Sequence, residues 1–424
     1  MKLLYDISIR IYDLLIFIAG LFGNKKAQLI YKGRKHTHSK ITEFRNTYKG
    51  KIAWFHCASL GEFEQARPLI EAFRIKYTEY KVALSFYSPS GYEIRKNYTG
   101  ADLIIYLPSD TQEHAGSFIG SLNPSIIFFI KYEFWLNFLD EIKKRNIPLF
   151  LVSGIFRPSM PFFKRTGDFM RLRLKTFSHF FLQNDPSGEL LNTIDVTNWS
   201  ISDDTRFDRV QLTAQNKSEI KEIAEFKQDT PLLVIGSAWK EDMNALIPFI
   251  NTFSEPLKII IAPHEIHPEE IHTFQSRITK KSDVYSSYKL NTKVSIDVLF
   301  IDNIGMLSSI YAYADYAYIG GAFKSGLHNI LEPAVFGPAV FFGPKIKKFP
   351  EAAWMISLGY AFSISNTKEF SELFRKIYSD PTLKLSIEQG LKSSMLEACG
   401  ATNHIMEHIS PYLLSKLPET RTIS

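Results

Sequence analysis

The chain of 424 residues contains only two cysteines, Cys57 and Cys399. Two cysteines this far apart fit neither a disulfide framework nor a zinc-binding spacing, so we expect a reducing compartment. No repeat with a period of roughly 20 to 50 residues is present, which argues against a solenoid. No small-residue cleavage site closes the apolar N-terminal stretch, so the sequence predicts no cleavable signal.

Acidic residues are scarce in the first 51 positions, which hold eleven Lys or Arg against three Asp or Glu. The local charge of +8 exceeds the +6 of the whole chain, so the remaining residues carry −2. A nucleic-acid-binding protein more often spreads its positive charge through the body of a domain. We therefore expect no nucleic-acid partner.

An uninterrupted apolar run long enough to cross a membrane is also missing. Residues 3–22 are strongly apolar, but Arg10 and Asp13 interrupt them, and the uncharged part is shorter than the roughly 20 residues of a spanning helix. A basic cluster from Lys25 to Lys51 follows. This composition is typical of a segment that lies in, or dips into, an anionic leaflet. The alternative is a helix packed on the domain, followed by a solvated basic loop. Whether the segment spans the bilayer stays open.

What the chain does contain is an alternation of apolar strands with helical patterns, which predicts parallel sheets covered by helices. In the first half the expected strands are Ile52–Phe55, Val82–Phe86, Leu103–Tyr106, Ile126–Ile130 and Leu149–Val152. The clearest helical patterns between them are Phe134–Lys144 and Arg171–Phe180.

A second alternation begins after the polar stretch 203–209. Its expected strands are 232–235, 258–261, 298–301, 316–319 and 339–342, and its expected helices are 242–253, 268–277, 306–314 and 330–336. At this length two domains are expected. We predict an α/β protein with two Rossmann-like, doubly wound domains that face a cleft. The expected divisions are a basic, apolar segment 1–50, domains 51–210 and 211–395, and a helical tail 396–424.

The first candidate site residue is Glu62. A strand over Ile52–Phe55 runs into the turn Ser59-Leu60-Gly61, and a helical pattern follows from about Glu62 towards Ile75. This order places Glu62 at the carboxyl end of a strand, where open α/β sheets bind their ligands, and a carboxylate there can act as a general base. The alternative is that Ser59 and Glu62 form a capping box.

The second candidate is the stretch Ile319–Pro333, in which a strand runs into a glycine-rich loop and then a helix. Glycines permit close backbone approach, and free N–H groups at a helix start favour a phosphate. Asn329 with Glu332 also forms a capping box, but capping does not explain the glycines together with His328. Glu332 could instead accept hydrogen bonds from two ribose hydroxyls.

Three further groups are candidates. Lys131 and Glu133 follow a strand, although an ordinary helix start explains them equally well. Arg206, in the connection between the halves, could face a leaving phosphate or be solvated. His264 and His267 lack a third metal ligand nearby, so we expect no metal.

Several motifs occur in a characteristic order: Ser59-Leu60-Gly61-Glu62-Phe63, Ala66-Arg67-Pro68-Leu69-Ile70, Glu133-Phe134-Trp135-Leu136-Asn137, Ile147–Val152, Arg206-Phe207-Asp208, Gly236-Ser237, Gly320-Gly321, His328–Pro333 and Phe342-Gly343-Pro344. Together they resemble the 3-deoxy-D-manno-octulosonic acid (Kdo) transferases of lipopolysaccharide biosynthesis, over most of the chain from about Trp54 to Phe362.

The resemblance implies a GT-B glycosyltransferase held at the cytoplasmic face of the inner membrane, where it contacts anionic lipid. Such an enzyme moves Kdo from CMP-Kdo to a lipid A precursor with inversion and needs neither a metal nor another cofactor. It also implies that Glu62 is the general base, that Glu133 stabilises the transition state, and that Arg206 replaces a stabilising lysine. The residues implied to hold CMP are Pro263, His264, Ile304, Gly305, Met306, Asn329, Ile330, Leu331 and Glu332.

Two departures from the family pattern stand out. Lys131 occupies a position that is usually acidic, and Pro263-His264-Glu265 lacks an arginine expected near the phosphate. A related fold that acts on a UDP-sugar, as a transferase or a 2-epimerase, is the nearest alternative. A non-catalytic, membrane-peripheral nucleotide-binding module is a more distant one.

Overall fold

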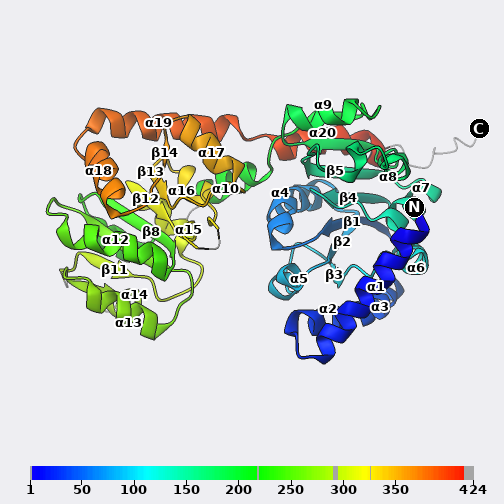
Figure 1. Ribbon diagram of the computed structural model, residues 1–424, viewed down its shortest axis with the longest axis horizontal. Coiled ribbons are helices and arrows are strands. Elements are labelled where there is room, and N and C mark those ends of the chain that lie inside the picture. Colours follow the sequence, from blue (N-terminus) through cyan, green and yellow to red (C-terminus); the bar gives the residue numbers. More distant parts are fainter. Residues whose placement is uncertain (1, 217–218, 290–294, 325, 415–424) are drawn as a thin grey trace, which may run out of the picture. The chain divides into compact units, whose positions relative to one another are not determined.

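The computed structural model describes residues 2–216, 219–289, 295–324 and 326–414 (Figure 1). The chain forms two compact units, one of residues 1–208 with 399–424 and the other of residues 209–398. Among the described residues, 2–50 and 399–414 belong to the first unit.

The first unit contains a seven-stranded parallel sheet with the strand order β3-β2-β1-β4-β5-β6-β7. Its strands are β1 Lys51–Cys57, β2 Tyr80–Phe86, β3 Leu103–Tyr106, β4 Ile126–Ile130, β5 Leu149–Gly154, β6 His179–Leu182 and β7 Trp199–Ile201. The helices between them are α4 Leu60–Lys76, α5 Pro89–Arg95, α6 Gln112–Leu122, α7 Leu136–Lys144, η1 Pro161–Phe163, α8 Asp168–Leu174 and α9 Asp185–Asn192. The helix expected over Arg171–Phe180 is wrong, because α8 ends at Leu174 and the apolar residues from His179 form a buried strand.

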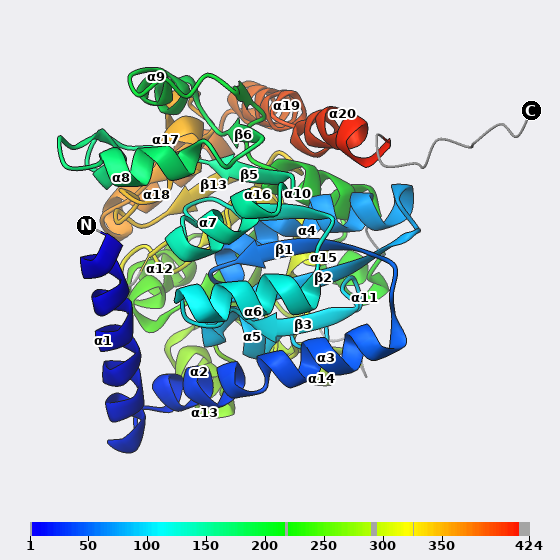
Figure 2. The same cartoon turned by 90° about the vertical axis from the view of Figure 1, so that its right-hand side faces the viewer.

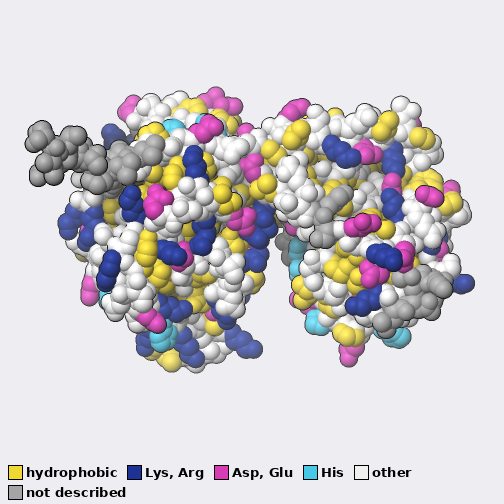
Figure 3. Space-filling model, turned by 180° about the vertical axis from the view of Figure 1, so that it is seen from behind, with side chains coloured by type: hydrophobic (Ala, Val, Ile, Leu, Met, Phe, Trp, Pro, Cys, Tyr) yellow, Lys and Arg dark blue, Asp and Glu magenta, His cyan; other side chains and the backbone are white. Residues whose placement is uncertain are grey.

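Three helices precede this sheet, α1 Lys2–Leu21, α2 Lys25–Lys35 and α3 Thr37–Thr47. In Figure 2, α1 runs down the left edge of the unit, and α2 and α3 run along its lower edge. Polar side chains attach α1: Tyr5 donates to Asp110 at 2.5 Å and Asn137 donates to Asp6 at 2.9 Å. Lys and Arg side chains gather at the lower end of the first unit (Figure 3). Among the described residues, no helix combines the length and apolarity that a membrane crossing needs.

The second unit contains a seven-stranded parallel sheet with the order β10-β11-β9-β8-β12-β13-β14. Its strands are β8 Leu232–Ala238, β9 Lys258–Pro263, β10 Ser282–Val284, β11 Val298–Phe300, β12 Tyr316–Ile319, β13 Ala339–Phe342 and β14 Ala361–Ser363. Its helices are α11 Lys221–Lys227, α12 Lys240–Thr252, α13 Pro268–Arg277, α14 Tyr285–Tyr288, α15 Leu307–Ile310, η2 Tyr311–Tyr313, α16 Leu331–Ala334, α17 Pro350–Ser357, α18 Thr367–Tyr378 and α19 Pro381–Glu397, and α10 Arg206–Gln215 starts in the first unit. The helices expected over 306–314 and 330–336 are shorter than predicted.

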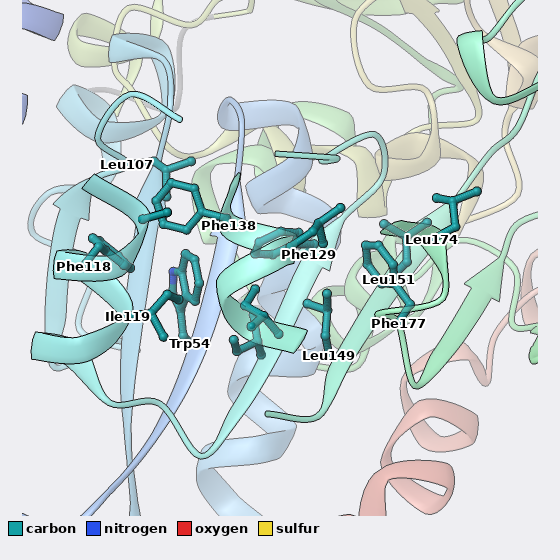
Figure 4. Packing of buried hydrophobic residues seen from close by; sticks show 14 of the residues in the cluster. Trp54, Leu107, Phe118, Ile119, Phe129, Phe138, Leu149, Leu151, Leu174 and Phe177 are labelled. Atoms are coloured by element: carbon teal, nitrogen blue, oxygen red, sulfur yellow. The ribbon is translucent and has the colours of Figure 1, made fainter. Parts of the chain in front are cut away.

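Both sheets are buried on their two faces, as parallel sheets generally are. In β1, Trp54 packs on one face against Phe129 and Phe138 (Figure 4), while Phe55 packs on the other against Phe128. The C-terminal helix α20 Ala401–Leu414 covers the second face together with α4. Asp208 caps α20, because it accepts hydrogen bonds from the N–H groups of Gly400 and Thr402.

The strand order reverses once in each sheet, between β1 and β4 and between β8 and β12. At such a point the loops after the two central strands diverge to opposite faces and leave a crevice at the carboxyl edge, where ligands of doubly wound sheets bind. Each unit therefore has one place where a substrate site is expected.

Candidate active site

Glu62 lies at the reversal point of the first sheet, in the first turn of α4, which begins at Leu60. The hydroxyl of Ser59 donates a hydrogen bond to the Glu62 carboxylate and makes none to the helix backbone. The capping box considered from the sequence is therefore not formed. Instead, Ser59 orients a partly exposed carboxylate at the end of β1.

Glu133 follows β4 on the other side of the reversal point and is buried. Its Oε2 lies 2.5 Å from Nε1 of Trp135 and 2.9 Å from Nε2 of His56. An imidazole with its proton on Nε2 donates to the Glu133 carboxylate in this arrangement, and Nε1 of Trp135 lies 3.2 Å from the same nitrogen. The Nδ1 of His56 lies 2.9 Å from the hydroxyl of Ser85. A buried chain of hydrogen bonds that spans β1, β2 and β4 thus holds Glu133 in place.

Sequence reasoning missed His56. It lies in β1 between apolar residues and is fully buried. A titratable residue inside an apolar strand, one position from that strand's carboxyl end, is the signal that could have identified it.

Both carboxylates lie around the end of β1. Burial raises the pKa of the Cys57 thiol, and the negative charges of Glu62 and Glu133 raise it further. Burial and the charge of Glu62 also raise the pKa of Tyr132, against the opposing effect of Arg157. Glu62 and Glu133 are separated by 71 positions in the sequence, but both lie near the carboxyl end of β1.

Arg206 is paired with Asp204. Its Nε and Nη2 lie 2.9 Å and 2.8 Å from Oδ2 of Asp204, which also accepts hydrogen bonds from Gln65 and Gln183. Burial opposes the ionised form, but the Arg206 guanidinium and the charge of Lys131 lower the pKa of Asp204. Lys131, at the position where an acid was expected, thus contributes positive charge beside the Arg206–Asp204 pair.

In the second unit, three rings stack at the carboxyl edge. Trp239, after β8, stacks on His264 with 4.1 Å between ring centroids, and His264 lies 4.4 Å from His328. Nε1 of Trp239 donates to Nε2 of His328 at 3.1 Å. Burial lowers the pKa of His328 to about 4, with a further contribution from His264. The stack joins the Pro263-His264 segment to the loop after β12, and the sequence did not identify Trp239.

In the glycine-rich loop, backbone N–H groups form hydrogen bonds within the protein. Gly320 N donates to Gly236 O, Gly326 N to Gly321 O, and Gly321 N to the carboxylate of Asp242. A Cβ at Gly320 would lie 2.1 Å from Ser237 O, so this position tolerates no side chain. These three loop amides are therefore already used within the protein. The expectation that N–H groups at the helix start favour a phosphate stays a prediction, and α16 has only four residues. Ser325 lies outside the described residues.

Glu332 is hydrogen-bonded to two residues that belong to, or lie beside, the other segments expected to hold the nucleotide. Its carboxylate accepts hydrogen bonds from Ser308 at 2.6 Å and from Asn329 at 3.0 Å. Ser308 belongs to α15, which directly follows the segment Ile304-Gly305-Met306, and the Ile304 side chain is 92% exposed. The side chains of Ile330 and Leu331 are buried, so only their backbone can face a ligand.

No group of three His, Cys, Asp or Glu side chains in the described part of the chain is arranged to hold a metal ion. The imidazole of His267 lies 3.1 Å from Glu265. The first edge therefore carries the three expected catalytic residues, and the second carries the residues expected to hold the nucleotide.

Residues 31–209 match the family model described as 3-deoxy-D-manno-octulosonic-acid transferase (kdotransferase). A 3-deoxy-D-manno-octulosonic acid transferase of Chlamydophila psittaci is 26% identical over 377 residues, which cover 84% of this chain and 86% of that protein. The protein of the same description in Rickettsia bellii is 25% identical over 365 residues, 83% of this chain and 84% of that protein.

Solved structures with a similar fold include a UDP-GlcNAc 2-epimerase of Neisseria meningitidis, with a TM-score of 0.58 at 13% identity over 86% of this chain and 100% of that one. MurG of Acinetobacter baumannii gives a TM-score of 0.55 at 13% identity over 85% of this chain and 99% of that one. These likenesses show a GT-B-like fold and nothing about chemistry. From the family match over residues 31–209 and from relatives that align with more than four-fifths of its length, the chain is similar to the 3-deoxy-D-manno-octulosonic-acid transferases.

Proposed function

We propose that this glycosyltransferase moves Kdo from CMP-Kdo to a sugar hydroxyl of a lipid A precursor, with inversion at the anomeric carbon and without a metal. The observation that carries the proposal is the carboxylate of Glu62, oriented by Ser59 at the reversal point of the first sheet and close to a second, buried carboxylate. An acid positioned in this way can take the proton of an attacking hydroxyl.

In the proposed reaction, Glu62 removes the proton from the acceptor hydroxyl as its oxygen bonds to the anomeric carbon of Kdo. The bond from that carbon to the CMP phosphate breaks, and the electron pair leaves with CMP. The positive charge that develops on the sugar is stabilised by Glu133, which His56 and Trp135 hold in place. Arg206, anchored by Asp204, and the neighbouring Lys131 provide positive charge for the departing phosphate.

The second unit is proposed to hold CMP. The rings of Trp239, His264 and His328 offer a flat surface to the nucleotide. The carboxylate of Glu332 receives two hydrogen bonds. Since a carboxylate has about four lone-pair positions, it retains capacity for ribose hydroxyls.

We further propose that α1 places the enzyme on the cytoplasmic face of the inner membrane. The side chains of Ile7, Ile11, Leu14 and Ile18 recur at three- and four-residue spacing and are exposed, while no residue of α1 is buried. A helix attached through polar contacts, with an apolar stripe facing outward, fits an interface between water and lipid. The basic residues of α2 and α3 would attract anionic lipid.

The experiment that tests the reaction is mass spectrometry of the lipid after incubation with CMP-Kdo and a tetra-acylated acceptor. A product heavier by a Kdo residue is expected from the wild-type enzyme. Stabilisation against heat by UDP but not by CMP would favour the alternative, a UDP-sugar transferase or 2-epimerase. Absence of product with every donor would leave only a nucleotide-binding module.

A further inference from the structure

The first unit contains a pocket of about 370 Å³ enclosed by α1, α2, α3, α6 and the loop after β3. Its wall is largely apolar and includes Ile16 of α1, Ile30 of α2, Ile41 of α3 and Phe118 of α6. The volume lies within the roughly 300 to 1,000 Å³ of small-molecule pockets. An apolar cavity of this size in contact with solvent is suited to a ligand with a hydrocarbon part.

Basic side chains border the pocket. Arg34 and Lys35 line it, and the one acid among the lining residues, Asp13, is paired with Nη1 of Arg34 at 3.1 Å. The Arg34 guanidinium also lies over the Tyr87 ring, 4.7 Å from its centroid, which holds it at the edge of the cavity. Two cations against one paired acid favour an anionic group beside the apolar cavity.

The position of the pocket relates it to the proposed membrane surface. Ile16 lines the pocket from the inner side of α1, while Ile11, Leu14 and Ile18 are exposed on the same helix. Figure 2 shows α1 on the left edge of the unit and α2 and α3 on its lower edge, below α6. None of the pocket residues comes from the segments that carry Glu62, Glu133 or Arg206, and β3 is the edge strand, two strands from β1.

We propose that this pocket binds one acyl chain of an anionic phospholipid drawn from the bilayer, with the lipid phosphate against Arg34 and Lys35. The inference rests on the membrane placement proposed above and not on the transfer reaction. A bilayer lipid fits better than the reacting lipid, because the pocket is lined by elements separate from the three residues proposed for catalysis. A bound lipid would fix α1 against the unit and orient the enzyme on the leaflet.

The test uses the full-length protein and dodecyl phosphate below its micelle concentration, with binding followed by calorimetry. One molecule per chain is expected to bind, and each added methylene should tighten binding about fourfold while the pocket has room. Inorganic phosphate and dodecanol serve as probes of the headgroup and the chain alone, and both should bind at least tenfold more weakly.

Two variants locate the site. Ser117 is exposed at the pocket mouth, 3.4 Å from His38, so Ser117→Trp should fill the entrance without disturbing the core and weaken dodecyl phosphate binding more than tenfold. Ser393→Trp, at an exposed serine of α19, is the matched control and should bind as the wild type does. Lys35→Gln should weaken dodecyl phosphate but not dodecanol.

The proposal is wrong if Ser117→Trp and Ser393→Trp bind dodecyl phosphate equally, or if binding never saturates at one molecule per chain. The choice of a bilayer lipid is wrong if Ser117→Trp raises KM for the lipid acceptor while the variant still co-sediments with phosphatidylglycerol vesicles as fully as the wild type. Loss of vesicle recovery with an unchanged acceptor KM would support it. Because calorimetry needs no turnover, absence of the proposed transfer reaction would not be mistaken for absence of lipid binding in the pocket.

Discussion

The two sheets share a parallel order with one reversal, yet their carboxyl edges differ in chemistry. The first edge carries charge: Glu62, buried Glu133, and Arg206 paired with Asp204. The second carries stacked rings and a closely packed glycine loop. The comparison teaches that the same fold places both candidate sites, whereas the few residues after the central strands give one edge its charge and the other its stacked rings.

The largest effect should come from removing the base at the first edge. Glu62→Gln keeps the shape of the side chain but not its basicity, so kcat should fall by about 100- to 10,000-fold while CMP binding stays at the wild-type value. Glu64→Gln is the control, since Glu64 pairs with Arg95 at 2.8 Å and has no proposed role. Near wild-type turnover of Glu62→Gln would place the base elsewhere.

A smaller effect is expected from the histidine that holds Glu133. His56→Phe retains an aromatic ring but removes the Nε2 donor, which leaves a buried carboxylate with fewer partners. The free energy of unfolding should fall by about 1 to 3 kcal/mol, and kcat should fall with little change in KM for the donor. Chemical denaturation and steady-state kinetics measure both.

Ser85→Ala removes the next link of the same chain and should have a milder effect on both quantities. If Ser85→Ala lowered kcat more than His56→Phe does, the order of the hydrogen-bond chain would be wrong.

At the second edge, Glu332→Gln should weaken CMP binding by about 10- to 100-fold, because hydrogen bonds to a charged acceptor contribute about 1.5 to 3 kcal/mol. Saturating donor should restore most of kcat, which is the opposite of the pattern for Glu62. Glu369→Gln, which alters a carboxylate at the start of α18, is the matched control. An unchanged CMP affinity for Glu332→Gln would remove Glu332 from the nucleotide site.

Each unit also contains a histidine with a lowered pKa, so acid should destabilise the folded state. Burial, His408 and His404 lower the pKa of His179 in the first unit to about 4, and burial lowers that of His328 in the second unit to about 4 as well. Between pH 6.5 and 4 the unfolded chain binds these protons more readily, so stability should be complete above about pH 6.5 and decline as the pH falls towards 4.

Melting curves across this range, for the wild type and for His179→Gln and His328→Gln, measure the effect. Each variant should flatten the dependence on pH. Two variants with the wild-type slope would show that neither imidazole is kept neutral by folding.

The smallest effect is expected from metal removal, because transfer is proposed to need no metal at either edge. Turnover in EDTA should equal turnover in buffer alone. A loss that Mg²⁺ or Mn²⁺ reverses would mean that a cation, rather than Arg206 and Lys131, meets the leaving phosphate.

The sequence predicted most of the fold, because strands such as Ile126–Ile130 are continuous apolar runs that a parallel sheet buries on both faces. It missed the three-residue strands Trp199–Ile201, Ser282–Val284 and Ala361–Ser363, which are too short to show a period. It also extended a helix into β6, because a short apolar run does not distinguish helix from strand.

The candidate site residues Glu62 and Glu332 were predicted from local motifs. The partners that give them their chemistry were not, because they come from distant positions. His56 reaches Glu133 across 77 residues, and Trp239 reaches His328 across 89. Such pairs exist only once the strands are aligned, and no spacing along the chain encodes them.

The internal hydrogen bonding of the loop after β12 has a consequence for how the enzyme responds to its surroundings. A loop that leaves amides open binds anions through fixed dipoles close to the ligand, and such contacts change little with salt. Since Gly320, Gly321 and Gly326 use their amides within the protein, attraction of the proposed, negatively charged donor would depend on exposed cationic side chains such as Lys324. Attraction of that kind is screened over about 8 Å at physiological ionic strength, so donor capture should slow as salt rises while the bound geometry stays the same.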